Sequence, residues 1–263
     1  MDWGEVGLRA QAEYLRHLAA SGTHEVRREG GALAVASGAK SNTENGVVGS
    51  RLDPIRADSL IAELVAWFAD SELPACWLCP EPPGALADRL VAAGCRAEQS
   101  GIEMGIGLAQ LPAAAEADVV SVRDERLLDA WLDVAVSCGW AEDDAERLAL
   151  RRLLVSDAFE RAAPVRLAVV MTGDRPAAMG RWFVAPPNLL LQDVAVAEHE
   201  RRRGLGRALV LAAAADGRAA GCRACVLAPT PEGAKLAASL GFETAPLPRD
   251  RWFYLPVSAR AAR

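Results

Sequence analysis

In both halves of the chain, the pattern of hydrophobic and polar residues predicts the same order of secondary-structure elements. ADSLIAELVAWFADSELP (57–74) has apolar residues at helical spacing, and GRALVLAAAADGRAAG (206–221) has a similar pattern. A short apolar run precedes each segment, GVVGSRL (46–52) and NLLLQDVAV (188–196), and such runs are typical of buried strands. Each half therefore predicts a strand followed by a helix.

An internal repeat follows each of these helices. Residues 75–96 read ACWLCPEPPGALADRLVAAGCR, and residues 224–242 read ACVLAPTPEGAKLAASLGF. Each copy starts with Ala-Cys-x-Leu, passes a proline-rich turn and continues through Gly-Ala into a short amphipathic helix that ends at a glycine. We interpret the two copies as one strand–turn–helix unit used twice; the alternative is a chance resemblance between two βαβ units.

The second half predicts further elements around this unit. A strand at 119–124 is followed by helices at 124–139 and 141–159, and then by a strand pair over 165–185 that turns at 173–176. The chain closes with an extended segment at 250–257. The resulting order β-α-α-β-β-β-α-β-α-β is typical of an α/β fold with a mixed sheet.

A boundary between two domains is expected near residue 115. AQLPAAAEADVV (109–120) is rich in alanine and proline and breaks the periodicity, so residues 110–118 are interpreted as a linker. We therefore expect an N-terminal domain at 1–112 and a C-terminal domain at 118–263.

Composition narrows the possible functions. Hydrophobic residues make up 51% and charged residues 24% of the 263 residues, as in an ordinary globular protein. The net charge of −6 argues against a nucleic-acid partner, which needs a basic face. No apolar stretch reaches the roughly 18 residues of a membrane-spanning helix, and the amphipathic start (1–18) lacks the features of a signal peptide. We expect a cytoplasmic protein with no membrane partner.

Two cysteine pairs have a spacing that metal sites also use. Cys76 and Cys79 form one pair, and Cys222 and Cys225 form the other. Both pairs lie in strand-like runs, where residues i and i+3 point to opposite faces. We interpret the four thiols as buried, reduced and structural, with a redox or metal role as the alternative.

The segment Arg201-Arg202-Arg203-Gly204-Leu205-Gly206 stands between the strand at 188–196 and the following helix. Such a strand–loop–helix junction directs unpaired amides and the helix dipole toward one point, where a phosphate group binds well. Glycine allows close backbone approach, and arginines add positive charge. Neither the Walker pattern nor GxGxxG is present. The first-half equivalent, DPIRADS (53–59), has no glycine, so only the second half is expected to bind a polyanion. A solvated basic turn is the alternative.

These residues together resemble the GNAT superfamily of N-acetyltransferases. VAVAEHERRRGLGRALV (194–210) is similar to that family's acetyl-CoA loop, and TPEGAKLAASLGFE (230–243) is similar to its second cofactor segment. The resemblance is strong over 118–256 and reaches 1–112 only through the internal repeat. It implies two GNAT-like lobes, each a mixed, mostly antiparallel sheet flanked by helices, with a degenerate copy at 1–112 and the acetyltransferase domain at 118–263.

The resemblance also implies where acetyl-CoA, the expected co-substrate, would bind, and it implies no metal. The backbone of Val194 to Val196 would pair with the pantetheine arm like an added strand, and the amides of 202–208 would hold the pyrophosphate. The expected cofactor-binding residues are Val194, Ala195, Val196, Arg201, Arg202, Arg203, Gly204, Leu205, Gly206, Arg207 and Ala208.

The implied reaction is direct attack of an amine on the acetyl thioester. It needs a neutral amine, a polarised carbonyl and a protonated leaving thiolate. The Val196 amide is the expected polarising group, and Asp193 is the expected acceptor of the ammonium proton; the alternative for Asp193 is a solvated or salt-bridged acid. Gln192 either positions a water or packs, and His199 either titrates usefully or is a solvated loop residue.

One position departs from the family pattern. The tyrosine that usually protonates the thiolate lies four residues before the glycine of Gly-Phe, where this chain has Ala237. Only Tyr14 and Tyr254 are tyrosines. Water, the substrate or Tyr254 would then supply the proton, or transfer would be impaired while cofactor binding persists.

Acidic and aromatic residues precede the predicted helix at 141–159. The acids at 142, 143, 144 and 146 either attract a cationic amine or stabilise the helix start through its dipole. Trp140 beside them is a candidate substrate contact, with packing as the alternative.

The sequence thus predicts an N-acetyltransferase that transfers an acetyl group from acetyl-CoA to a primary amine of a small molecule. A non-catalytic acyl-CoA sensor or scaffold, or a protein N-acetyltransferase, is the alternative. A homodimer is left open.

Overall fold

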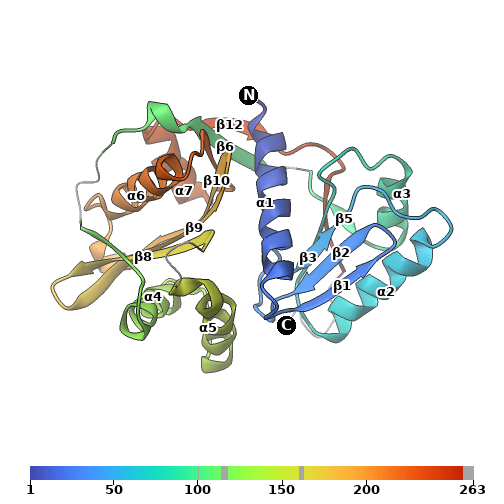
Figure 1. Cartoon of the computed structure of the whole chain (residues 1–263), viewed down its shortest axis with the longest axis horizontal. Coiled ribbons are helices and arrows are strands. Elements are labelled where there is room, and N and C mark those ends of the chain that lie inside the picture. The colour runs from blue at the N-terminus through green and yellow to red at the C-terminus, as the bar shows by residue number, and fades with distance from the viewer. Residues whose placement is uncertain (100, 114–117, 160–162, 257–263) are drawn as a thin grey trace. The chain divides into compact units, whose positions relative to one another are not determined.

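The computed structural model describes residues 1–99, 101–113, 118–159 and 163–256 (Figure 1). The chain forms two compact units. Unit 1 contains Met1–Ala10 and Ile102–Ala245, and unit 2 contains Gln11–Gly101 and the chain from Pro246 onward. Within the described ranges, no helix is both long enough and apolar enough to cross a bilayer.

Unit 1 is built on a seven-stranded sheet of order β12-β6-β11-β10-β9-β8-β7. The strands are β6 (Ile102–Gly107), β7 (Val119–Ser121), β8 (Val165–Thr172), β9 (Arg175–Ala185), β10 (Asn188–Val196), β11 (Ala224–Leu227) and β12 (Glu243–Pro246). β10 and β11 are parallel, whereas β7 to β10 form antiparallel neighbours and β11 is antiparallel to β6. The expected mixed sheet is confirmed.

Helices cover both faces of this sheet (Figure 1). They are α4 (Glu125–Ser137), α5 (Asp144–Ala158), α6 (Leu205–Ala219) and α7 (Pro231–Ser239), with short 3-10 turns η1 (Leu108–Gln110) and η2 (Glu198–Glu200). α4 starts where Asp124 Oδ1 accepts a hydrogen bond from Leu127 N at 2.8 Å. It is anchored to β9 by Trp131, whose buried Nε1 donates to Gly180 O at 2.9 Å. α6 and α7 share an apolar core with the other face, to which Leu209 and Ala237 contribute.

Unit 2 repeats the arrangement with shorter strands in the order β1-β2-β3-β4-β13-β5. The strands are β1 (Glu25–Glu29), β2 (Ala32–Ala36), β3 (Gly46–Val48), β4 (Cys76–Leu78), β5 (Arg96–Ala97) and β13 (Trp252–Tyr254), and the helices are α2 (Ala57–Asp70) and α3 (Ala85–Ala92). α1 (Trp3–Ala20) contributes its residues from Gln11 onward. The internal repeat corresponds to β4–α3 and β11–α7.

The two halves exchange one strand each, so the expected boundaries at 1–112 and 118–263 do not coincide with the compact units. β6 comes from the first half but pairs with β11 in unit 1. β13 comes from the end of the chain but pairs with both β4 and β5 in unit 2. Each exchanged strand satisfies backbone groups that a sheet edge would otherwise leave unpaired. The expected linker is described only at residues 110–113 and 118.

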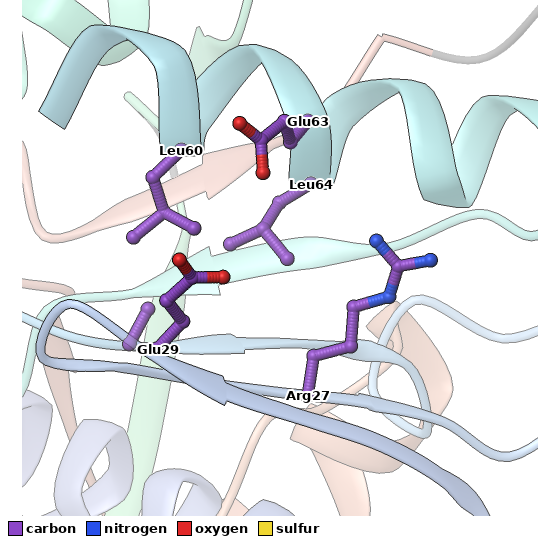
Figure 2. A pocket seen from close by; sticks show the side chains of 6 residues that line it. Arg27, Glu29, Leu60, Glu63 and Leu64 are labelled. Atoms are coloured by element: carbon purple, nitrogen blue, oxygen red, sulfur yellow. The ribbon is translucent and has the colours of Figure 1, made fainter. Parts of the chain in front are cut away.

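The edge strand β1 carries charged side chains over an apolar face. Arg27 and Glu29 point toward α2, beside Leu60 and Leu64 (Figure 2). The Arg27 guanidinium lies 4.6 Å from the ring centroid of Trp67, so its charge and its apolar stem cover the helix together. The hollow among these side chains has a volume of only about 10 Å³, about the least that can hold one water, and it is too small for a ligand.

Candidate functional site

A cavity opens in unit 1 where two parallel strands separate. β10 and β11 pair only from Asn188–Leu190 to Ala224–Val226. Beyond that point a bulge between Leu191 and Asp193 interrupts the register of β10 with β9. The gap is a cavity of about 320 Å³, within the range of roughly 300–1,000 Å³ typical of small-molecule sites. Residues that line it include Trp140, Gln192, Asp193, Val194, Ala237 and Phe242.

Backbone groups at the end of β10 face the space that β11 leaves. Ala197 N donates to Ala177 O of β9 at 2.9 Å. Because backbone direction alternates along an antiparallel strand, Ala195 also faces β9, whereas Val194 and Val196 present their amides on the open side. Of the three residues expected to pair with a pantetheine arm, Val194 and Val196 are thus oriented for it, and the backbone of Ala195 is used within the sheet.

The arginine–glycine loop leads from η2 into α6. Gly204 at the helix N-cap has φ +82°, and Arg202 has φ +63°, so two nearby residues adopt the left-handed conformation that shapes anion-binding backbone turns. Within the described chain, no hydrogen bond occupies the amides of residues 202–207. The amide of Ala208, also expected to bind pyrophosphate, instead donates to Gly204 O at 3.0 Å. The open set of amides is therefore one residue shorter than predicted.

The start of α6 lies very close to α7. A Cβ added at Gly206 would lie 3.1 Å from Leu236 Cδ2 of α7 and 3.8 Å from side-chain atoms of Val194 and Val196. Glycine at this position lets the loop and the cavity adjoin each other. The expected cofactor residue Leu205 is different, because its side chain is buried in the core beside Leu209.

The arginines of the loop divide into two pairs. Arg201 Nε donates to Val196 O at 3.3 Å, and Arg203 forms an ion pair with the buried Glu200. These two side chains brace the loop. Arg202 and Arg207 have no hydrogen bond or ion pair within the described residues, so their guanidinium groups can serve a bound phosphate.

Asp193 is paired with a buried cation. Its Oδ2 accepts a hydrogen bond from Arg181 Nε, directly opposite on β9, and the two side chains are 13% and 5% exposed. Asp193 also lines the cavity. The salt-bridged interpretation is therefore correct for the side chain, while the predicted role as proton acceptor stays a prediction.

Gln192 places an unsatisfied amide in the cavity wall. It is the extra residue of the β10 bulge, and its Oε1 is buried without a hydrogen-bond partner in the described part of the chain. An unpaired buried oxygen costs free energy unless a ligand or water satisfies it. The sequence does not distinguish packing from water positioning for this residue, because the bulge that turns it toward the cavity has no local signature.

Neither tyrosine is among the described residues that line this cavity. Ala237, at the family's tyrosine position, is 3% exposed and forms part of the wall. Tyr14 donates its hydroxyl to Glu44 at 2.5 Å. Tyr254 lies in β13 of unit 2, with the Arg96 guanidinium 4.6 Å from its ring centroid, and burial raises its pKa to about 12. Both tyrosines have structural partners in unit 2.

The acidic residues before α5 cap that helix. Glu146 N donates to Asp143 Oδ1 and Glu142 N donates to Glu146 Oε2, both at 2.8 Å, which is a reciprocal capping arrangement. The helix-start interpretation is therefore confirmed for Asp143 and Glu146. Trp140 lines the cavity and packs edge-on against Trp131 with ring centroids 6.4 Å apart, while its contact with a substrate stays a prediction. His199 is exposed in η2, 3.8 Å from Glu200.

The equivalent strands of unit 2 stay paired where those of unit 1 separate. Val48 of β3 pairs with Leu78 of β4, and Gly49 N donates to Leu78 O at 3.0 Å. The Gly49 carbonyl accepts hydrogen bonds from Trp77 Nε1 at 2.8 Å and Cys79 Sγ at 3.3 Å. In the repeat, Leu78 corresponds to Leu227, which lies beyond the last paired residues of β10 and β11. Hydrogen bonds thus close the gap that a pantetheine arm would need.

The four cysteines of the two sequence pairs are buried and free, as expected. Burial raises the pKa of the Cys79 thiol to about 12 and also raises the pKa of Cys76 and Cys225. These thiols stay protonated at neutral pH and behave as small apolar side chains. In the ranges that the structure describes, no group of three or more metal-binding side chains occurs.

Comparisons with known proteins bear on this arrangement. Residues 127–242 match the sequence model of the Acetyltransferase (GNAT) family. No curated protein matches the chain. Among solved structures, the GCN5-related N-acetyltransferase from Kribbella flavida is similar with a TM-score of 0.68 at 18% identity, covering 98% of each chain. A tandem GNAT protein from the clavulanic acid biosynthesis pathway has a TM-score of 0.55 at 15% identity, covering 94% of this chain and 92% of its own.

A protein of unknown function from Staphylococcus epidermidis ATCC 12228 is also similar, with a TM-score of 0.57 at 12% identity, covering 87% of this chain and 90% of its own. At these identities the likeness concerns the fold, and it extends over both units. The chain therefore carries a GNAT acetyltransferase-family domain at residues 127–242, within the two-lobed fold that tandem GNAT proteins share.

Proposed function

We propose that unit 1 transfers an acetyl group from acetyl-CoA to a primary amine of a small molecule by direct attack. One observation supports this most strongly. The separation of β10 from β11 creates a cavity beside a loop whose amides at 202–207 are open, so one elongated ligand with a diphosphate can use both.

The residues present fit the proposed co-substrate. Val194 and Val196 would pair with the pantetheine amides, and the open amides of 202–207 would hold the diphosphate, assisted by Arg202 and Arg207. The apolar walls, including Phe242 and Leu236, suit a pantetheine chain. When bound, acetyl-CoA supplies the acetyl group as an activated thioester.

Three residues at the end of β10 would act on the reacting groups. The Val196 amide points into the gap and would donate a hydrogen bond to the acetyl carbonyl. Asp193 would give up its pairing with Arg181 if it accepted a proton, which weakens the case for a direct base. We therefore favour water as the direct acceptor of the ammonium proton, with the Asp193–Arg181 ion pair keeping the wall polar and Gln192 orienting the amine or the water. Water would also supply the proton that the departing CoA thiolate takes up.

Unit 2 is proposed to be the degenerate copy. Its β3–β4 gap is closed by the hydrogen bonds at Gly49, and its loop after β3 lacks the glycines of 204 and 206. The proposed boundaries follow the exchanged strands rather than a single cut near residue 115.

A non-catalytic acyl-CoA sensor is the second candidate, and Ala237 favours it. The cavity wall offers a methyl group at the position of the expected thiolate acid. An alanine there would still allow the cofactor to bind, whereas turnover would lack the usual proton donor. A protein N-acetyltransferase is a further alternative that differs only in the acceptor.

Calorimetric titration with CoA tests the cofactor site. Gly204→Glu puts a negative charge at the α6 N-terminus and should weaken CoA binding at least about tenfold. Gly221→Glu is the matched control, because Gly221 has φ +87°, has no atom within 4 Å of an added Cβ and follows the other end of α6. Equal losses in both variants, or no CoA binding by the wild type, would refute the proposed site.

Thiol release from acetyl-CoA separates the enzyme from the sensor. A panel of small amines and lysine-containing peptides is incubated with the wild type and with Gly204→Glu. Release that a small amine stimulates, and that the variant loses, supports the N-acetyltransferase. Tight CoA binding without stimulated release supports the sensor, and stimulation by peptides alone supports the protein-modifying alternative.

A further inference from the structure

The carboxyl ends of β3 and β4 in unit 2 border a second hollow, separate from the closed gap between the strands. Its volume is about 530 Å³, within the range of roughly 300–1,000 Å³ seen for small-molecule pockets. Arg16 of α1, Arg28 of β1 and Arg51 after β3 line it, and Glu81 is also at its wall. Three separate segments thus bring their arginines to one place.

Each of the three arginines has a weak or exposed partner. Arg28 Nη2 donates to Ala19 O at 3.4 Å. Arg16 Nη1 bonds Glu13 at 2.6 Å on the same helix, and both side chains are about half exposed. Arg51 Nη2 lies 3.6 Å from Glu81 Oε2. Ion pairs of this exposed kind add little free energy, so a ligand can replace them readily.

The charge of the hollow and the residues that line it indicate what kind of ligand it binds. The chain has a net charge of −6, yet this hollow combines three arginines with one glutamate. Like charges held together repel each other unless an anion lies among them. Leu33, Val48 and Pro80 add apolar wall. The hydrogen bonds of Gly49 close the gap between β3 and β4. The hollow therefore cannot extend between these strands to hold a long ligand such as a pantetheine arm.

We propose that unit 2 binds a small organic anion with two or more carboxylate or phosphate groups in this hollow, through Arg16, Arg28 and Arg51. The site is independent of the acetyl-CoA site proposed for unit 1. Its ligand is compact, and the guanidinium groups recognise it by charge-assisted hydrogen bonds.

Calorimetry on the full chain, with citrate and with inorganic pyrophosphate as probes at constant ionic strength, tests the site. The titrations are repeated in Gly204→Glu, so that pyrophosphate binding at the α6 loop is removed. Saturable binding that survives Gly204→Glu supports the proposal. Tighter binding of citrate identifies carboxylates as the preferred groups, and tighter binding of pyrophosphate identifies phosphates. Absence of saturable binding of either probe overturns the proposal.

Two triple variants that remove the same net charge distinguish loss of the proposed site from a general change in charge. Arg16→Gln/Arg28→Gln/Arg51→Gln should weaken binding of the better probe at least about tenfold. Arg27→Gln/Arg56→Gln/Arg89→Gln removes the same charge from residues that do not line the hollow, with Arg27 on the α2 side of β1 (Figure 2), and should change it less than about twofold. Equal loss in both triple variants overturns the proposal.

A gain of affinity provides a second readout that misfolding cannot imitate. Glu81→Gln removes the carboxylate that competes for Arg51 and should tighten binding of the probe about twofold or more. Glu63 lies on α2 (Figure 2) and does not line this hollow. Glu63→Gln makes the same charge change and should therefore leave the affinity unchanged. Unchanged affinity in Glu81→Gln would count against the proposed site.

Discussion

Arg181 of β9 and Asp193 of β10 are cross-strand partners whose side chains form an ion pair at the wall of the cavity. Arg181 is 4% exposed, so its charge depends on an anion close by. The pair holds the strands together just beyond the bulge, where β10 has lost β11 as a neighbour. It therefore stabilises the open geometry of the proposed site.

Removing one member of the ion pair should lower the free energy of unfolding. Asp193→Asn leaves the buried Arg181 guanidinium without the Asp193 carboxylate, and the free energy of unfolding should fall by about 3 kcal/mol. The double variant Arg181→Met/Asp193→Leu should recover most of that loss, because neither charge is then left alone. Urea denaturation of the wild type, Arg181→Met, Asp193→Leu and the double variant measures the coupling.

The same double variant tests the chemical role of Asp193. If the Arg181–Asp193 ion pair has only a structural role, the folded double variant keeps amine-stimulated thiol release. Loss of release with an unchanged affinity for CoA would identify Asp193 as the proton acceptor after all.

Gln192 should show opposite effects on stability and on function. Gln192→Leu removes the buried Oε1 that lacks a partner, so the free energy of unfolding should rise by about 1 kcal/mol. The same change should raise the KM for the amine several-fold and leave CoA affinity unaffected. Denaturation and steady-state kinetics check the two halves of the prediction, and a destabilised variant with a normal KM would show that Gln192 only packs.

Local patterns predicted the elements from β7 to α7 and the repeat, because each depends on periodicity within a short window, but they did not predict β6 or β12 of unit 1. The strand exchange could not be predicted in this way. β13 has three residues, and it pairs with Trp77 and Ala97 more than 150 positions earlier in the sequence. β1 (EVRRE) is exposed and charged, so it lacks the alternation that identifies a strand.

The parts of the site that depend on backbone conformation could be predicted from the sequence. The parts that depend on contacts between distant residues were harder to predict. Gly204 and Gly206 indicated the loop because glycine has a direct conformational meaning. The ion pair of Asp193 depends on the β9–β10 register, and the orientation of Gln192 toward the cavity depends on the bulge; neither can be read from a short segment of sequence. Likewise, the sequence predicts Ala208 as part of the phosphate loop, whereas its amide makes the first helical hydrogen bond of α6.

The closed gap of unit 2 should depend on Trp77. Trp77→Phe removes the Nε1 donor to the Gly49 carbonyl, which keeps its Cys79 contact, so we expect a loss of about 1–2 kcal/mol. Trp67→Phe, at the partly exposed edge of α2, should lose less than about 1 kcal/mol. Denaturation measures both variants. Equal effects would mean that the indole hydrogen bond does not hold the gap closed.

Glu103 of β6 should make stability depend on pH. It is 2% exposed, its Oε2 has no partner in the described residues, and its carboxyl packs so tightly under α1 that a Cβ on Gly7 would lie 2.5 Å from it. Burial raises the pKa of Glu103 to about 8, from an ordinary value of 4.5. Between these two values the folded protein retains a proton that the unfolded chain releases.

The Glu103 contribution to stability should therefore be complete below about pH 4.5 and should decline as the pH rises toward about 8, by up to about 1.4 kcal/mol per pH unit. Glu103→Gln stays neutral, so its stability should lack this decline and should exceed that of the wild type at pH 8.5. Urea denaturation at pH 5, 7 and 8.5 checks this, with Glu243→Gln as a control, because Glu243 accepts a hydrogen bond from Trp3 at the same end of α1. Parallel pH profiles for the wild type and Glu103→Gln would show that Glu103 ionises near its ordinary pKa.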